Sequence, residues 1–156
     1  MDAVIKQITS PHRLETLEKD KEVDFSYGIK GVGRFRVNVY QEKNGPAIAF
    51  RVIPYLIPSF EAIGLGPVAE KIANLPRGLV LVTGPTGSGK STTLATILDY
   101  INYHRQCHII TIEDPIEFIY HHKKSMVTQR EINSHTFSFA KAIKSALRQD
   151  PDVVLV

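Results

Sequence analysis

The sequence predicts an α/β protein, in which a mostly parallel sheet follows a small α+β domain. After residue 78, short apolar runs alternate with amphipathic helical segments, as in parallel sheets covered by helices. Before residue 54, alternating polar and apolar residues flank a hairpin signal, which indicates antiparallel strands. We expect a first domain over residues 1–53, a linker with a short helix over 54–77, and the N-terminal part of a second domain over 78–156.

The first domain is expected to begin with two helices and to continue as an antiparallel sheet. Ser10-Pro11 interrupts the charged helical segment at the N-terminus, because the residue before a proline disfavours the helical conformation. Residues 34–40 alternate strictly, and Asn44-Gly45 predicts a hairpin that leads to a returning strand over 47–53. The side chains expected to point into the core are Phe35, Val37 and Val39.

A phosphate-binding loop is the most specific signal in the chain. Residues 84–91 fit the pattern G-x-x-x-x-G-K-[ST], with an apolar run expected to be a strand over 79–82 before them and an amphipathic helical pattern after them. Glycines let the backbone wrap a phosphate, and the N-terminus of the following helix favours an anion. The pattern places Lys90 to reach the β- and γ-phosphates of ATP and the Ser91 hydroxyl to ligate Mg²⁺. The candidate nucleotide-binding residues of this segment are Gly84, Pro85, Thr86, Gly87, Ser88, Gly89, Lys90, Ser91 and Thr92.

Two later apolar runs predict the remaining strands of the parallel sheet. One covers residues 109–112 and ends in Glu113 and Asp114, and the other covers 153–156. Acidic residues at the carboxyl end of a parallel strand lie where open α/β sheets bind their ligands. Between the two runs, Thr136 is expected to cap a helix. Its expected apolar face comprises Phe139, Ile143, Ala146 and Leu147.

Charge, hydropathy and cysteine content bear on whether the protein binds nucleic acid, spans a membrane or contains disulfides. The net charge of +3 is too small and too dispersed to indicate a nucleic-acid partner. No apolar run approaches the ~20 residues that a transmembrane helix needs. The single cysteine, Cys107, excludes an intrachain disulfide and fits a reducing compartment. We therefore expect a cytoplasmic protein without a transmembrane segment.

Three segments in this order resemble the secretion ATPase superfamily of type II and type IV secretion systems. They are Arg77–Thr92 (RGLVLVTGPTGSGKST), Ile110–Glu117 (ITIEDPIE) and Ala146–Val156 (ALRQDPDVVLV). The upstream GRFRVNVY and FRVIP resemble the N-terminal domain of the same family. The resemblance runs from about Val23 to the end of the chain and is strongest to the type IV pilus retraction ATPases. It implies a RecA-like P-loop NTPase sheet, preceded by a PAS-like domain.

The resemblance also implies roles for individual residues. Glu113 matches the catalytic glutamate of the family's Asp box, which orients or activates the attacking water. Arg34, Arg36 and Arg51 match arginines of the N-terminal domain, some of which contact nucleotide phosphates in the assembled ring. From the residues alone, a solvated strand face is the better explanation for Arg34 and Arg36, and the resemblance makes a nucleotide-contacting role about equally favoured.

Further motifs of the family are not in the sequence. Asp150, Pro151 and residues 153–156 match the run that leads into the Walker B motif, whose Gly-Glu follows that run in the family. The His box and a C-terminal helical region lie further on in the family. We therefore expect a central fragment whose sheet is incomplete at its C-terminal side and which hydrolyses ATP poorly by itself.

The function implied by the resemblance is that of an ATP-hydrolysing motor subunit. Such a subunit works in a homo-hexameric ring, is held at the inner membrane by a pilus platform protein, and drives pilus retraction and twitching motility. Three alternatives stay open: a pilus-assembly or type II secretion ATPase, another P-loop enzyme such as a small-molecule kinase, and a non-catalytic nucleotide-binding fragment. The kinase is disfavoured because the sequence has no recognisable acceptor site or lid.

Overall fold

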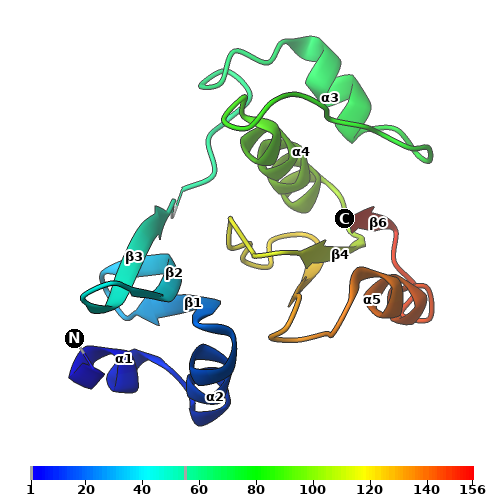
Figure 1. Cartoon of the computed structure of the whole chain (residues 1–156). Coiled ribbons are helices and arrows are strands. Elements are labelled where there is room, and N and C mark those ends of the chain that lie inside the picture. Colours follow the sequence, from blue (N-terminus) through cyan, green and yellow to red (C-terminus); the bar gives the residue numbers. More distant parts are fainter. Residues whose placement is uncertain (1, 55) are drawn as a thin grey trace. The chain divides into compact units, whose positions relative to one another are not determined.

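The computed structural model describes residues 2–54 and 56–156 and divides into two units, Met1–Tyr55 and Leu56–Val156. Each unit has its own sheet and its own buried core (Figure 1). Among the described residues, no helix is both long enough and apolar enough to cross a bilayer. The elements of unit 1 are α1 (Asp2–Ile8), α2 (Pro11–Asp20), β1 (Glu22–Ile29), β2 (Gly33–Glu42) and β3 (Gly45–Ile53). Those of unit 2 are α3 (Pro67–Ala73), α4 (Lys90–His104), β4 (His108–Glu113), β5 (Met126–Glu131), α5 (Phe139–Ala146) and β6 (Val153–Leu155).

Unit 1 is an antiparallel sheet in the order β1-β2-β3, with two helices on one face (Figure 1). The break between the helices falls at Ser10-Pro11 as predicted, and Pro11 occupies the first turn of α2, where its missing N–H costs nothing. The predicted inward residues are confirmed: Val37 and Val39 are fully buried, and Phe35 packs against the same core. Their alternation therefore leaves the polar side chains of β2 on the opposite face of the sheet.

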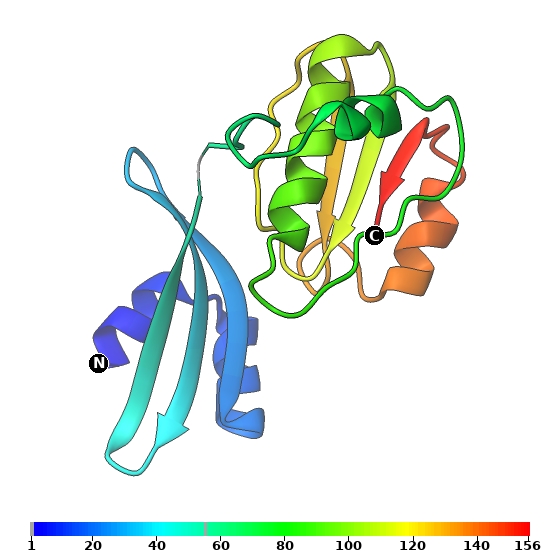
Figure 2. The same ribbon diagram turned by 90° about the horizontal axis from the view of Figure 1, so that it is seen from above.

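Unit 2 has a parallel sheet in the order β5-β4-β6, with helices on both of its faces (Figures 1 and 2). Ile109 joins a core with α3 and α4, whereas Ile110 and Ile112 join a core with α5. β4 is apolar on both faces because it is the central strand between these two cores. The segment expected as a linker with a short helix covers residues 54–77, and its part from residue 56 on contributes to this unit, since Phe60, Ala69 and Ala73 are buried in the core with α4.

The prediction of a strand over residues 79–82 is wrong for this structure. The segment forms no strand, and Leu79 and Leu81 are 83% and 75% exposed. It lines a cavity of about 470 Å³ together with β6 and α4. Among the described residues this run has no strand partner, and β6 pairs only with β4.

Two further elements differ from the sequence-based expectation. The sequence pattern predicts no full strand over residues 126–131, but β5 pairs with β4 along six residues. α5 begins after Ser138, whose hydroxyl accepts a hydrogen bond from the Lys141 N–H, and not at Thr136. The buried residues of α5 are Ala142 and Ala146, while Leu147 is 72% exposed. Ala146 and Ile143 of the expected face therefore pack against the core with Ala142, whereas Leu147 does not.

Candidate functional site

The loop over residues 84–91 turns tightly before α4, and two of its glycines are required by the backbone. Gly84 has φ +156°, and a Cβ built on it would lie 2.6 Å from the Ser88 Oγ. Gly89 has φ +86° and is the N-cap residue of α4. An L side chain would be strained at either position, so the glycines of the motif are explained by the conformation of the loop.

Lys90 and Ser91 are the first two residues of α4, directly after this loop. The Lys90 Nζ donates a hydrogen bond to the Pro85 carbonyl oxygen at 2.8 Å. The ammonium group therefore lies beside the main chain of the loop. Together with the unpaired N–H groups of the first helical turn, it provides positive charge at this end of α4.

Glu113 is the last residue of β4, and its carboxylate is held on the α4 side of the sheet. Its Oε1 accepts hydrogen bonds from the Thr111 Oγ1 at 2.5 Å and from the Gln129 Nε2 at 3.3 Å. Burial raises the pKa of Glu113 above its usual value of 4.5, although these hydrogen bonds and one from the Glu117 main chain oppose that shift. A half-buried carboxylate with a raised pKa is typical of a group that handles protons.

Figure 2 shows the arrowhead of β4 at the same end of unit 2 as the loop that enters α4. The structure therefore brings Glu113 and the residues of the loop to one end of the parallel sheet. This is the end at which open α/β sheets bind their ligands. Such an arrangement can bind a chain of phosphates at the helix N-terminus and present a carboxylate beside it.

The three candidate arginines belong to unit 1, whereas the loop and Glu113 belong to unit 2. Arg34 and Arg36 alternate with the inward residues of β2. Arg51 lies on β3, where it is the register partner of Arg36. All three therefore lie on the sheet face opposite the helices of that unit. The Arg34 Nη2 donates to the Ser26 Oγ at 2.7 Å, and the Arg36 Nε lies 3.9 Å from the Asp24 Oδ1.

The run expected to lead into the Walker B motif forms β6, parallel to β4. Its preceding residue, Asp152, accepts a hydrogen bond from the His108 N–H and donates its own N–H to the His108 carbonyl oxygen. This double contact aligns the beginnings of β6 and β4. Residues 153–155 therefore run towards the same end of the sheet as Glu113.

Gln129 is a further residue of the site. The segment Gln129-Arg130-Glu131 resembles a recurring segment of the family near the site, but its charge pattern fits an exposed turn equally well. It lies on β5 directly beside Thr111 of β4, and its side chain contacts Glu113 and the segment over residues 118–120. The signal that could have identified it is the parallel pairing of β5 with β4. Because residues 128–131 carry no apolar alternation, the sequence alone did not predict this strand.

Comparisons with known proteins agree with this architecture. A family model described as "Type II/IV secretion system protein" matches residues 12–156. The twitching motility protein of Neisseria gonorrhoeae is 51% identical over 153 residues, which cover 98% of this chain and 41% of that protein. The type IV pilus retraction ATPase PilT of Pseudomonas aeruginosa is 49% identical over 154 residues, which cover 99% of this chain and 45% of that protein.

Solved structures of related ATPases are also similar to this chain. A crystal structure of the pilus retraction motor PilT with bound ADP matches with a TM-score of 0.95 at 49% identity, over 98% of this chain and 45% of that one. The Legionella pneumophila ATPase DotB matches with a TM-score of 0.82 at 32% identity, over 96% of this chain and 44% of that one. These likenesses confirm the predicted P-loop NTPase fold, and the chain spans less than half the length of these relatives. Because the family model covers nearly the whole sequence, the chain belongs to the type II/IV secretion system protein family.

Proposed function

We propose that this chain is the nucleotide-binding part of an ATP-hydrolysing motor that drives retraction of a type IV pilus. The observation that carries the proposal is the placement of the loop over 84–91 and of Glu113 at one end of the parallel sheet. The loop residues 84–92 bind the phosphates of ATP, and Lys90 neutralises charge on the β- and γ-phosphates. Glu113 then positions the attacking water and accepts its proton.

Magnesium is the metal that suits this site. Ser91 offers one hydroxyl oxygen next to the phosphate loop, and Mg²⁺ prefers oxygen ligands while keeping several waters and substrate phosphates. The ion, when bound, neutralises negative charge on the phosphates. The part of this chain is to supply the Ser91 oxygen and to hold the phosphates against the helix N-terminus.

The role as a motor is proposed for the complete protein, because the chain spans less than half of its relatives. Relatives about half identical to it are named for twitching motility and for pilus retraction. We infer a homo-hexameric ring in the cytoplasm, bound at the inner membrane through the pilus platform protein. In that ring Arg34, Arg36 and Arg51 approach the phosphates of a bound nucleotide, where arginines stabilise the charge of the transition state.

Replacing Glu113 with Gln in the complete protein tests this assignment. The substitution keeps the size of the side chain and removes the proton acceptor. ATP affinity should therefore stay within about twofold, while turnover falls on the order of 10²-fold or more. Glu70→Gln, at an exposed position of α3, is the matched control and should change neither quantity. Equal losses of affinity and turnover in Glu113→Gln would assign Glu113 a structural role instead.

A further inference from the structure

The Gln129 side chain uses both of its polar atoms inside unit 2. Its Nε2 donates to the Phe118 carbonyl oxygen at 2.8 Å and to the Glu113 Oε1 at 3.3 Å. Its Oε1 accepts a hydrogen bond from the Tyr120 N–H at 2.9 Å. One carboxamide therefore links the carboxyl end of β4 to the main chain of residues 118–120.

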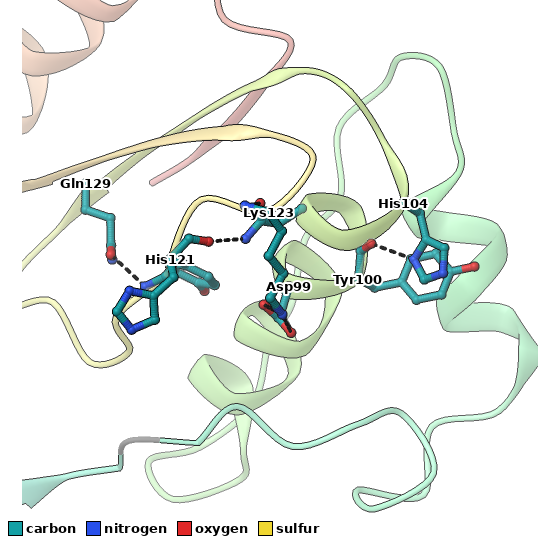
Figure 3. A network of polar contacts seen from close by, with 8 residues as sticks. Asp99, Tyr100, His104, His121, Lys123 and Gln129 are labelled. Atoms are coloured by element: carbon teal, nitrogen blue, oxygen red, sulfur yellow. Dashed lines mark hydrogen bonds and ion pairs between the residues drawn. The ribbon is translucent and has the colours of Figure 1, made fainter.

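The main-chain contacts fix which way this carboxamide faces. The Phe118 carbonyl needs a donor and the Tyr120 N–H needs an acceptor, so exchanging the amide oxygen and nitrogen would lose both hydrogen bonds. Figure 3 shows the Gln129 carboxamide turned towards the segment that also carries His121. The NH₂ group is consequently held on the side where Glu113 lies.

The Glu113 Oε1 thus has two donors from neighbouring strands. Thr111 lies two residues before Glu113 on β4, and Gln129 is the register partner of Thr111 on β5. Two donors that converge on one carboxylate oxygen from different directions restrict rotation of the carboxyl group. A general base gains from such restriction, because its rate depends on the geometry of the water that it holds.

We propose that Gln129 is a positioning residue for Glu113, which orients the carboxylate for hydrolysis and ties that orientation to the segment over residues 118–120. This proposal rests on the proposed function of Glu113. Gln129 itself does not touch nucleotide in this account. Its loss should reduce turnover and leave ATP affinity unchanged.

The test uses Gln129→Met and Gln129→Glu in the complete protein. Met keeps the approximate volume and removes every hydrogen bond. Glu keeps an acceptor for the Tyr120 N–H but replaces the donor with a negative charge. Turnover at pH 7 should fall about 10-fold or more in both variants, which is the scale for a misplaced catalytic group. Gln149→Met, at a surface glutamine that donates to Ser145, is the matched control.

The pH dependence of turnover separates positioning from a general structural defect. The ionisable groups around Glu113 are Glu117, Tyr120 and Glu131, and Glu131 is the register partner of Glu113 on β5. A hydrogen bond to a carboxylate lowers its pKa, so losing the Gln129 donor raises the pKa of Glu113 further. The acid limb of the rate profile should therefore move to higher pH in Gln129→Met and further in Gln129→Glu. The position of this limb does not depend on how much of the variant folds.

A double-mutant cycle with Glu113→Gln completes the test. If Gln129 acts through Glu113, then Gln129→Met should reduce turnover little in the Glu113→Gln background. An unshifted acid limb, or losses that multiply in the double variant, would overturn the positioning role alone. Normal turnover in the Glu113→Gln single variant would instead overturn the proposed function and the positioning role with it.

Discussion

At the scale of single residues, the close packing of Gly84 against Ser88 makes the phosphate loop compact. A Cβ at Gly84 would meet the Ser88 Oγ at 2.6 Å, which is closer than real Cβ contacts. Ser88 is held in turn by its N–H, which donates to the Pro85 carbonyl oxygen. A side chain at position 84 therefore displaces the Ser88 hydroxyl and strains the backbone, which has φ +156° there, in the turn that the phosphates are expected to occupy.

Gly84→Ala should accordingly weaken ATP binding by about 10-fold or more, because the loop can no longer approach the phosphates closely. Gly66→Ala is the matched control, since Gly66 has a negative φ and nothing lies within 4 Å of a Cβ built there. Isothermal titration of ATP into each variant gives the comparison. Equal affinities for the two variants would show that the close contact with Ser88 has no role in binding.

The residues of the phosphate loop could be predicted because they are neighbours in the sequence. The glycines, Lys90 and Ser91 follow one another in eight residues, and the sequence places them without knowledge of the tertiary fold. Gln129 could not be predicted in this way. Its contact with Glu113 exists only because β5 lies beside β4 in register.

At the scale of elements, α4 holds the segment over residues 121–125 through the buried side chain of Asn102. The Asn102 Nδ2 donates to the His121 carbonyl oxygen at 2.7 Å, and its Oδ1 accepts from the Lys123 N–H at 3.2 Å. One turn earlier on α4, Asp99 forms an ion pair with the Lys123 Nζ at 2.7 Å (Figure 3). This segment leads directly into β5, so α4 helps to place the strand that carries Gln129.

Asn102→Ala should lower the free energy of unfolding by about 2 kcal/mol or more. The substitution removes a fully buried carboxamide and leaves the His121 carbonyl and the Lys123 N–H without their side-chain partner. Asn74→Ala removes one exposed hydrogen bond to the Glu70 carbonyl and should change the same quantity by less than about 0.5 kcal/mol. Urea unfolding of unit 2 measures both. Similar losses in the two variants would contradict the anchoring role of Asn102.

Strands were predictable where their burial shows directly in the sequence, either as an alternation or as a continuous apolar run. The alternation over residues 34–40 and the apolar run of β4 both gave correct strands. The run over 79–82 has the composition of a strand, yet β propensity cannot supply a hydrogen-bonded neighbour. The start of α5 was misplaced by two residues because both Thr136 and Ser138 are good capping residues, and only the contact with Lys141 distinguishes them.

At the scale of the whole molecule, the three arginines of unit 1 are the proposed contacts to nucleotide phosphates in the assembled ring. The sheet face of unit 1 that lies opposite its helices carries Arg34, Arg36 and Arg51. The Arg36 contact with Asp24 is long and half-exposed, so it contributes less than about 1 kcal/mol to the stability of that unit. The Asp24 carboxylate therefore holds the Arg36 guanidinium only weakly.

Alanine at each of these three arginines should separate catalysis from stability. At least one variant of the complete protein should lose turnover on the order of 10³-fold, which is the scale for an arginine that stabilises a phosphoryl-transfer transition state. Thermal unfolding of unit 1 should change little in Arg36→Ala. Lys43→Ala, in the exposed hairpin between β2 and β3, is the control. Full activity in all three arginine variants would exclude unit 1 from the catalytic site.

The central claim is that the loop before α4 binds the phosphates of ATP. The most direct measurement is the equilibrium dissociation constant for ATP with Mg²⁺ in the complete protein, in Lys90→Ala, and in Lys71→Ala as an exposed lysine on α3. Lys90 is the side-chain cation at the helix N-terminus that the loop brings beside its own main chain. The account predicts that Lys90→Ala weakens ATP binding by about 10-fold or more, while Lys71→Ala binds as the unmodified protein does. Unchanged ATP affinity in Lys90→Ala would contradict it.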